Sequence, residues 1–432
     1  MEALAFLRER TKTRTGRVIF IILCLMPVAG GVIGQILSHA WAFMDIDAVL
    51  CAARAEASGH SPYGVLACPG LRPAPYVYAP QVAALFIAPL HLLGGLGARW
   101  AYLLLLFYPA ATALVWYSLG RALPDVDWRY RLLAFSGLVP MAFCSGNFGV
   151  VMHAAVIFSL VAWPKRSWIF GALVLACAVI KPTFLLYFLV FMFESRPWRQ
   201  RLLNLALAGG AGVAVVAVTV LTAGPWAGAW RQALGAVALS EQPGLGWFAF
   251  TSLLHMVPQA PGTLGLTLLF MAAMAASGLA VAEAGRLDDE ARRVLAIGLV
   301  PLLTPRLMDY DMLQIVPCIA LLMGLAPGLG GRIYRYNLSW GFTGVLGFGV
   351  ATNVLHIARH WPRSHVAMGL FCALVLASGA RVAMTMVERW EKRRGPPQRK
   401  KREKATLGSP LRVRPVAGGE DARGEVAGKI FK

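Results

Sequence analysis

The chain has 432 residues, of which 58% are hydrophobic and only 14% are charged, and its mean hydropathy is +0.61. A soluble domain carries roughly 25% charged residues, so this composition excludes a water-soluble globular protein. The formal net charge is +20. Its distribution argues against nucleic-acid binding, because the basic residues gather at the flanks of apolar segments, as the positive-inside rule expects of membrane proteins.

The N-terminal segment predicts a signal anchor. Several Arg and Lys residues precede an apolar run over residues 18–37, which has about the 20 residues needed to cross 30 Å of hydrocarbon. The run is too long for the apolar part of a cleavable signal peptide, and no small-residue cleavage site follows it cleanly. We therefore predict a basic cytoplasmic N-terminus over residues 1–17 and a first membrane span over residues 18–37.

Residues 39–98 form the longest predicted connection before the C-terminal tail, and we assign them to the first outer loop. Segments near 45–58 and 80–93 are predicted as helices that lie at the membrane interface. A thirteenth span at 80–95 is the alternative, but it would invert every later loop and remove the charge bias. Cys51 and Cys68 share this loop and can pair there, while two unpaired membrane cysteines are the alternative.

Further apolar segments follow the loop, and with the first span they predict an all-α polytopic membrane protein with about twelve transmembrane helices. They cover residues 99–120, 131–145, 147–163, 168–180, 183–194, 203–222, 262–283, 292–304, 312–328, 337–357 and 367–387. The cytoplasmic connections of this threading carry more Lys and Arg than the outer ones. We therefore predict a multi-pass protein of the bacterial inner membrane with both termini in the cytoplasm.

Several predicted spans are short and meet at polar or proline-containing joints. These joints are Ser145–Gly146–Asn147, Lys181–Pro182 and Thr304–Pro305, and all three fall on the outer side. Irregular backbone at membrane depth survives only where protein or water surrounds it. We therefore expect the three joints to surround one outward-facing cavity.

The predicted transmembrane domain covers residues 18–388, and a basic tail follows it. Nine basic and two acidic residues lie between Arg389 and Lys404. Residues 389–432 are predicted to be a disordered cytoplasmic tail. Binding of this tail to anionic lipid is a second interpretation of its charge.

Two acids just past the first span are the candidate catalytic residues. Asp45 and Asp47 lie where a carboxylate can face the outer side. Ionisable groups at the rim of a membrane domain are costly and are therefore functional candidates. We predict a general base that removes a proton from an acceptor hydroxyl, with Asp45 as first choice and Asp47 as second. Capping of the following helix is the alternative.

Two cations are candidates for binding a phosphate. Lys181 ends an apolar run, so its buried charge needs an anionic partner. A phosphate is one such anion. Snorkelling to the interface is the alternative. Arg306 lies in a polar outer connection, where an ion pair with Asp309 or Asp311 is equally compatible with the sequence. Those two acids are alternatively placed to order sugar hydroxyls.

Other polar and aromatic residues are candidates for binding sugar or acceptor. Gly146-Asn147-Phe148-Gly149 predicts a compact turn whose amide can bind a sugar or a phosphate. Trp247 can stack on a sugar face, although interfacial aromatic residues usually belong to the membrane belt. His153 and the other outer or intramembrane histidines show no metal-ligand spacing, so no metal site is predicted.

Several motifs occur in a characteristic order. Asp45 precedes an Ala-rich segment that ends at Gly59 and is followed by Ser61-Pro62-Tyr63. The next motif along the chain is Tyr76-Val77-Tyr78-Ala79-Pro80. The later motifs are Gly146-Asn147, Gly171 with Lys181-Pro182, and Thr304-Pro305 with Asp309-Tyr310. In this order the chain resembles the GT-C glycosyltransferases, and specifically family 87, which includes phosphatidylinositol-mannoside mannosyltransferases. Val49 and Leu50 stand where the family often has a tyrosine, and Asn147 stands at a family glutamine.

The resemblance implies a GT-C-type fold and transfer of a sugar, commonly mannose, from a polyprenyl-phosphate donor to a lipid or glycan acceptor at the outer face. It implies inversion at the anomeric carbon, with Asp45 as base and Lys181, helped by Arg306, on the donor phosphate. Sugar or acceptor contacts are expected from Asn147, Tyr63, Tyr78, Asp309, Tyr310 and Trp247. No cofactor or essential metal is expected, because the cations already neutralise a phosphate.

Two other function classes fit parts of the pattern. A transporter or flippase of envelope lipids or glycans would also place polar groups at broken helices, but it would be expected to show paired internal repeats, and the sequence has no convincing repeat. A non-catalytic assembly protein of an envelope pathway is the third interpretation.

Overall fold

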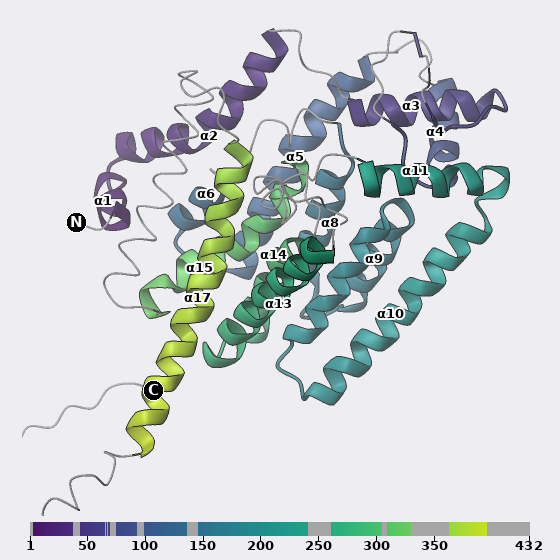
Figure 1. The fold of residues 1–432 in the computed structure, drawn as a ribbon. Coiled ribbons are helices and arrows are strands. Elements are labelled where there is room, and N and C mark those ends of the chain that lie inside the picture. Colours follow the sequence, from purple (N-terminus) through teal and green to yellow (C-terminus); the bar gives the residue numbers. More distant parts are fainter. Residues whose placement is uncertain are drawn as a thin grey trace, which may run out of the picture. The chain divides into compact units, whose positions relative to one another are not determined.

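The structure is a computed structural model of the chain, and it describes residues 3–37, 44–64, 66, 68–69, 75–92, 99–135, 146–240, 261–304, 309–329 and 363–394 (Figure 1). Every regular element in these ranges is a helix, so the prediction of an all-α protein is confirmed. The chain divides into two compact units, residues 1–384 and 385–432. In the second unit, the described residues are the helical end of α17 (Arg363–Arg394), which is exposed from Met386 to Glu391.

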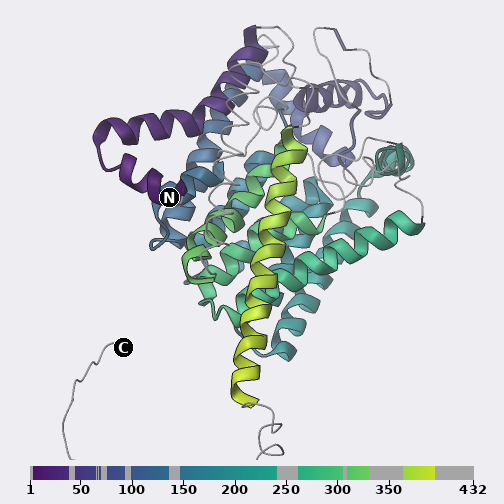
Figure 2. The same cartoon turned by 60° about the vertical axis from the view of Figure 1, so that its left-hand side comes forward.

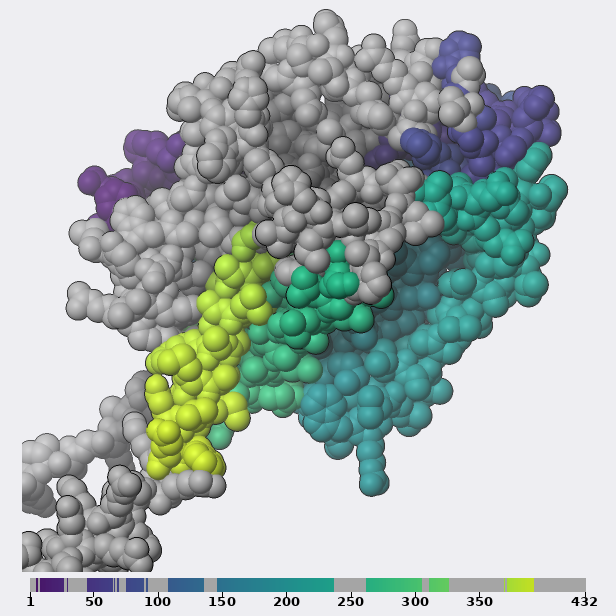
Figure 3. Space-filling model, viewed as in Figure 1, coloured from purple at the N-terminus to yellow at the C-terminus, as the bar shows by residue number. Residues whose placement is uncertain are grey.

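Three of the described helices are long and apolar enough to cross a membrane. They are α10 (Trp198–Leu221), α13 (Pro261–Ala284) and α17. Large apolar side chains cover the outside of α10, where Leu207, Val213 and Leu221 are 66%, 69% and 83% exposed. Lipid tails solvate such side chains, whereas water does not. Figure 3 shows α10 and the following helix α11 (Ala227–Ser240) as a continuous teal surface. The number of spans stays a prediction.

Most of the other predicted spans coincide with helices. They are α2 (Arg14–Leu37), α5 (Arg99–Ala122), α8 (Gly149–Ala162), α9 (Trp168–Ile180), α14 (Asp289–Leu299) and α15 (Val316–Leu329). The short α6 (Trp128–Phe135) covers the beginning of the span predicted at 131–145. The span predicted at 337–357 lies outside the described residues. A short helix, α1 (Ala3–Arg10), precedes α2.

The span predicted at 183–194 coincides with a helix, η1 (Pro182–Phe193), which is of the 3-10 type. Pro182 at its start has no N–H to donate to the preceding helix, and the chain at Lys181 is extended. A 3-10 helix rises about 2.0 Å per residue, so these 12 residues reach roughly 24 Å, against about 18 Å for an α-helix. The tighter coil therefore lets a 12-residue segment cover a greater length than an α-helix would.

Helices of the first unit pack against their neighbours in the sequence and also against helices that are distant in the sequence. α8 packs against α5 and α9, η1 packs against α9 and α10, and α14 packs against α15. At Gly298 of α14, an added Cβ would lie 2.3 Å from the backbone nitrogen of Cys318 in α15, so the two helices touch backbone to backbone. Small residues allow such close approach in membrane bundles. Two short 3-10 helices, η3 (Val300–Leu303) and η4 (Asp309–Ile315), lie between α14 and α15.

The predicted helices of the first outer loop are present as α3 (Met44–Ala57) and α4 (Pro80–Leu92), which pack against each other. Helix α11, which the sequence did not predict, lies beside them in both Figure 1 and Figure 2. Trp230 Nε1 of α11 donates to the carbonyl oxygen of Val77 over 3.3 Å. Gln81 Nε2 of α4 donates to Thr222 Oγ1, which follows α10, over 2.8 Å. These bonds join the first outer loop to the end of α10 and to α11.

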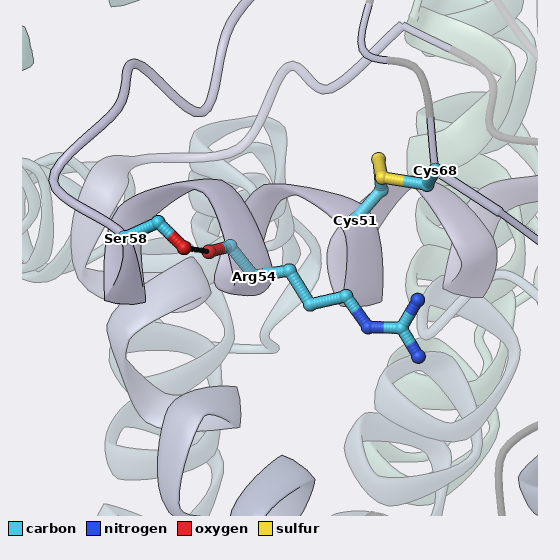
Figure 4. The surroundings of a disulfide bond; sticks show 4 residues. All are labelled: Cys51, Arg54, Ser58 and Cys68. Carbon is cyan, nitrogen blue, oxygen red and sulfur yellow. Dashed lines mark hydrogen bonds between the residues drawn. A yellow bond between two sulfur atoms is a disulfide. The ribbon is translucent and has the colours of Figure 1, made fainter.

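Cys51 and Cys68 form a disulfide, which decides between the two alternatives that the sequence left open. Their Cα atoms lie 5.9 Å apart, and the Cys51 side chain is buried. Figure 4 shows the bond at α3, together with the Ser58 hydroxyl, which donates to the carbonyl oxygen of Arg54 over 3.0 Å. The chain that leaves α3 is thus tied back to that helix covalently.

The contacts between distant segments agree with the predicted sides of the membrane. Arg8 before the first span forms an ion pair with Asp127 in a predicted cytoplasmic connection, with 3.4 Å between the charged atoms. Glu283 at the end of α13 pairs with Arg201 of α10 at 2.7 Å and Arg292 of α14 at 2.9 Å, and both cations belong to predicted cytoplasmic flanks. Each pair joins residues that the threading places on one side. The absolute orientation stays a prediction.

Candidate active site

The first turn of α3 carries both candidate bases, Asp45 and Asp47, and each is half-buried. A carboxylate at this end of a helix is stabilised by the peptide dipoles. Asp45 Oδ2 accepts a hydrogen bond from Asn147 Nδ2 over 3.1 Å. Burial raises the pKa of Asp45 above its ordinary value, while the Asn147 hydrogen bond and the charge of Lys181 act in the opposite direction. A carboxylate tuned in this way is a better proton acceptor than one in water.

Asn147 is buried and uses its side-chain amide to join three parts of the site. Its oxygen Oδ1 accepts from the backbone N–H of Gly149 over 2.7 Å, and its Nδ2 donates to Asp45 and, over 3.3 Å, to the hydroxyl of Tyr78. The hydroxyl of Tyr108 in α5 donates to its backbone carbonyl oxygen over 3.4 Å. The amide was predicted to bind sugar or phosphate. The structure gives it a direct contact with the candidate base, and a sugar contact stays a prediction.

The two glycines of the Gly146-Asn147-Phe148-Gly149 turn are required for different physical reasons. Gly146 has a φ of 72°, a left-handed conformation that favours glycine. A Cβ added at Gly149 would lie 2.7 Å from Asn147 Oδ1 and 3.5 Å from Asp311 Oδ1. The turn therefore places the backbone of Gly149 between the Asn147 amide and the Asp311 carboxylate, where no larger residue fits without displacement.

Two of the predicted tyrosines, Tyr63 and Tyr78, belong to an aromatic cluster with Tyr76. The ring centroids of Tyr76 lie 5.4 Å from those of Tyr63 and 5.8 Å from those of Tyr78. Tyr63 is buried, and its hydroxyl donates to the backbone carbonyl oxygen of Tyr78 over 2.8 Å. Tyr63 therefore supports the backbone of Tyr78, whose own hydroxyl reaches Asn147. Burial, and then the charges of Asp45 and Asp311, raise the pKa of Tyr78, so this phenol stays protonated.

Lys181 meets an anion of the protein itself. Its Nζ donates to Asp311 Oδ1 over 3.2 Å, and His153 Nε2 lies 3.2 Å from the same oxygen. The Lys181 side chain is 23% exposed, whereas those of Asp311 and His153 are 7% and 4% exposed. The sequence suggested Asp311 only as a partner of Arg306 or a ligand of sugar. It missed His153, for which the one signal was an isolated polar residue in the apolar run of α8.

Three further side chains fix His153. Its Nδ1 lies 3.0 Å from the hydroxyl of Tyr187, and its ring stacks on Phe184 with 4.4 Å between centroids. The Tyr187 hydroxyl donates to Gln314 Oε1 over 3.3 Å, and Gln314 Nε2 is in close contact with His153 Nε2. Buried polar groups need such partners, and a fully connected network holds its members in one arrangement.

The base and the cation belong to one site. Asn147 contacts Asp45, and the backbone of Gly149 lies between Asn147 and Asp311. Asp311 in turn contacts Lys181. The residues come from the first turn of α3, the turn before α8, the joint between α9 and η1, and η4. Since α8 and α9 have only 14 and 13 residues, each reaches roughly 20 Å and ends short of a 30 Å membrane, so their polar ends can meet.

The remaining predicted residues are not placed. Arg306 and Trp247 lie outside the described residues, and so do the side chains of Asp309 and Tyr310 at the start of η4. Within the described part of the chain, no three His, Cys, Asp or Glu side chains are grouped to hold a metal ion. Whether the protein needs a metal stays a prediction.

The model of glycosyltransferase family 87 matches residues 76–305, more than half of the chain. The chain belongs to glycosyltransferase family 87. The matched region includes Asn147 and Lys181, whereas Asp45 and Asp311 lie on either side of it. No curated protein and no solved structure matches the chain. As a member of family 87, the protein is a membrane glycosyltransferase that uses a sugar donor and an acceptor. The membership favours the enzyme over the transporter and the assembly protein.

Proposed function

We propose that this glycosyltransferase moves a sugar, with mannose as the first candidate, from a polyprenyl-phosphate donor to a lipid or glycan acceptor at the extracytoplasmic face. One observation carries the proposal: a chain of contacts through Asn147, Gly149 and Asp311 joins Asp45 to Lys181. These two residues are 136 positions apart in the numbering, and they lie at the ends of short helices. A carboxylate beside an ammonium suits a reaction that removes a proton from one substrate and releases an anion from the other.

The acceptor reacts at the carboxylate. The acceptor hydroxyl gives its proton to Asp45 as its oxygen forms a bond to the anomeric carbon of the donor sugar. Asn147 holds the carboxylate by Oδ2, and this contact fixes the direction from which the proton is taken. Attack opposite the departing phosphate inverts the configuration at that carbon.

The donor phosphate leaves at the cation. As the bond between the anomeric carbon and the phosphate oxygen breaks, both electrons stay on the phosphate, whose negative charge increases. The Lys181 ammonium stabilises that charge more strongly than it would in water, because Asp311 and His153 beside it are buried. Arg306 is proposed as a second cation. The apolar faces of the surrounding helices suit a lipid tail.

The experiment supplies purified protein in detergent with polyprenyl-phosphate mannose and candidate acceptor lipids. Asp45→Asn keeps the size of the side chain and removes the base, so turnover should fall about 10²- to 10⁴-fold while the thermal midpoint stays close to that of the native protein. Asp47→Asn is the matched control from the same helical turn. Full activity of both variants would refute the carboxylate mechanism, and loss in Asp47→Asn alone would move the base to Asp47.

A second arm tests the donor site. Lys181→Ala should raise the KM for the polyprenyl-phosphate sugar more than the KM for the acceptor, because it removes the charge that meets the phosphate. Equal effects on the two KM values would show that Lys181 serves the structure of the protein. A nucleotide-activated sugar in place of the lipid donor should give no product in the native protein.

A further inference from the structure

We propose that Asp311 is a positioning residue for Lys181, and that it restrains the ammonium for the departing phosphate at the cost of weaker donor binding. The inference rests on the proposed function, in which Lys181 meets the donor phosphate. Asp311 then has opposite effects on kcat and on donor binding. Its carboxylate supports turnover, and it weakens binding of the anionic donor.

Lys181 needs an external restraint. It follows the last residue of α9, in extended backbone with a φ of −134° and a ψ of 96°. Its four-carbon side chain rotates freely in comparison with an arginine fork, and it is the most exposed member of the cluster. An ammonium carries three donors, so it can hold Asp311 and contact a phosphate at the same time.

Asp311 is the fixed partner. It lies in η4, its side chain is buried, and Oδ1 meets both Lys181 and His153 at 3.2 Å. His153 is itself held by Tyr187 and by the ring of Phe184. Gln314 follows Asp311 by three residues, the spacing that aligns side chains on a 3-10 helix, and it contacts His153 as well. One network therefore holds the carboxylate, and the carboxylate holds the lysine.

The same carboxylate weakens anion binding. Among the described residues that carry this argument, Asp45 and Asp311 contribute carboxylates and Lys181 contributes an ammonium. A phosphodiester donor brings a further negative charge, and the released lipid monophosphate carries more. In a buried site these repulsions are only partly screened. Asp311 thus lowers the affinity of the site for the donor and lowers it further for the lipid phosphate product.

The test is Asp311→Asn in the full-length protein, assayed with the lipid donor. The amide keeps the size and an acceptor oxygen but removes the charge. We expect kcat to fall about 10- to 100-fold because the ammonium is less well restrained. The KM for the donor should not rise, and inhibition by polyprenyl phosphate should become stronger. Asp125→Asn, which removes an exposed acid elsewhere, is the charge control and should leave all three values unchanged.

A double-mutant cycle separates this inference from the proposed function. If Asp311 acts through Lys181, adding Asp311→Asn to Lys181→Ala should reduce kcat/KM no further than Lys181→Ala alone. Additive losses, or a raised donor KM in Asp311→Asn, would overturn the positioning role while leaving the donor site intact. An unchanged donor KM in Lys181→Ala would instead refute the proposed function itself.

A second variant covers the case in which Asp311→Asn does not fold. Tyr187→Phe removes one hydroxyl from the far end of the network and leaves Asp311 in place. It should lower kcat about 2- to 10-fold with an unchanged donor KM, because His153 and Gln314 each lose a hydrogen-bond partner. Native kcat in Tyr187→Phe would overturn the inference.

Discussion

Asn147 Nδ2 donates a hydrogen bond to Asp45 Oδ2 over 3.1 Å and thereby joins residues 102 positions apart in the sequence. The bond connects the first outer loop to the turn before α8, so it links the candidate base directly to the turn that precedes this helix. Because the amide also holds Tyr78 and Gly149, its removal should loosen these neighbours as well as the base.

The first prediction concerns pH. Asn147→Ala removes a hydrogen bond to the charged form of Asp45, so the pKa of Asp45, already raised by burial, should rise further. The base works in its ionised form, so the acidic limb of the plot of kcat/KM against pH should move to higher pH by about one unit, the equivalent of 1.4 kcal/mol. Tyr78→Phe, which removes another partner of the amide, is the control and should shift the limb less. An unshifted limb in Asn147→Ala would exclude Asp45 as the titrating base.

The second prediction concerns the space at Gly149. In Gly149→Ala the new Cβ would lie 2.7 Å from Asn147 Oδ1, so the amide must move away from Asp45. We expect a loss of activity and a destabilisation of about 1–3 kcal/mol from overpacking. Gly171→Ala in α9 has no neighbouring atom within 4 Å of the added Cβ and should be neutral. Activity and the thermal midpoint in detergent, measured for both variants, check the prediction, and native activity in Gly149→Ala would contradict it.

The third prediction concerns the disulfide. The bond closes a loop with a sequence separation of 17 residues. In the chain-entropy model a loop of this size contributes about 3 kcal/mol, so Cys68→Ala should lower the thermal midpoint. Reducing agent should lower the midpoint of the native protein and leave that of the variant unchanged. Alkylation without prior reduction, followed by mass spectrometry, should leave Cys51 and Cys68 unmodified, and their labelling would show that the bond is absent.

The fourth prediction concerns the opposite end of the bundle. Glu283 accepts from Arg292 and pairs with Arg201, and both arginine side chains are buried. Glu283→Gln leaves two buried cations without their shared anion, so we expect a loss of about 1–3 kcal/mol in stability. The KM values for donor and acceptor should not change, because the cluster is not part of the candidate site. A changed donor KM would show that the two ends of the bundle are coupled.

The sequence predicted the helices best where apolar runs are long. The segments at 203–222 and 262–283 match α10 and α13 within a few residues, because hydrocarbon thickness alone sets their length. It did not predict α11, a short helix with Arg231 and Gln232 in its middle, which is held in place by the contact between Trp230 and Val77. Periodicity also could not distinguish the 3-10 form of η1, since that depends on Pro182 and on neighbouring helices.

The candidate site was also predictable only in part, because the contacts between its residues depend on tertiary packing. Asp45 and Lys181 attract attention because a charge beside an apolar run is costly wherever it lies. The partner that satisfies each charge is a matter of tertiary packing. Asp311 reaches Lys181 across 130 residues and His153 across 158, and no local pattern connects such positions. His153 is one polar residue in an apolar helix, which by itself suggests a packed core residue.

The disulfide at Cys51 has a consequence for how the protein matures. Cells form such bonds in oxidising extracytoplasmic compartments and keep thiols reduced in the cytoplasm. With the proposed orientation, Cys51 and Cys68 are free thiols when the chain is inserted into the membrane. The disulfide forms when these thiols are oxidised on the extracytoplasmic side. Production in a host that lacks periplasmic oxidation should therefore yield protein that is correctly inserted but less heat-resistant, so the choice of expression strain bears directly on any attempt to purify the enzyme.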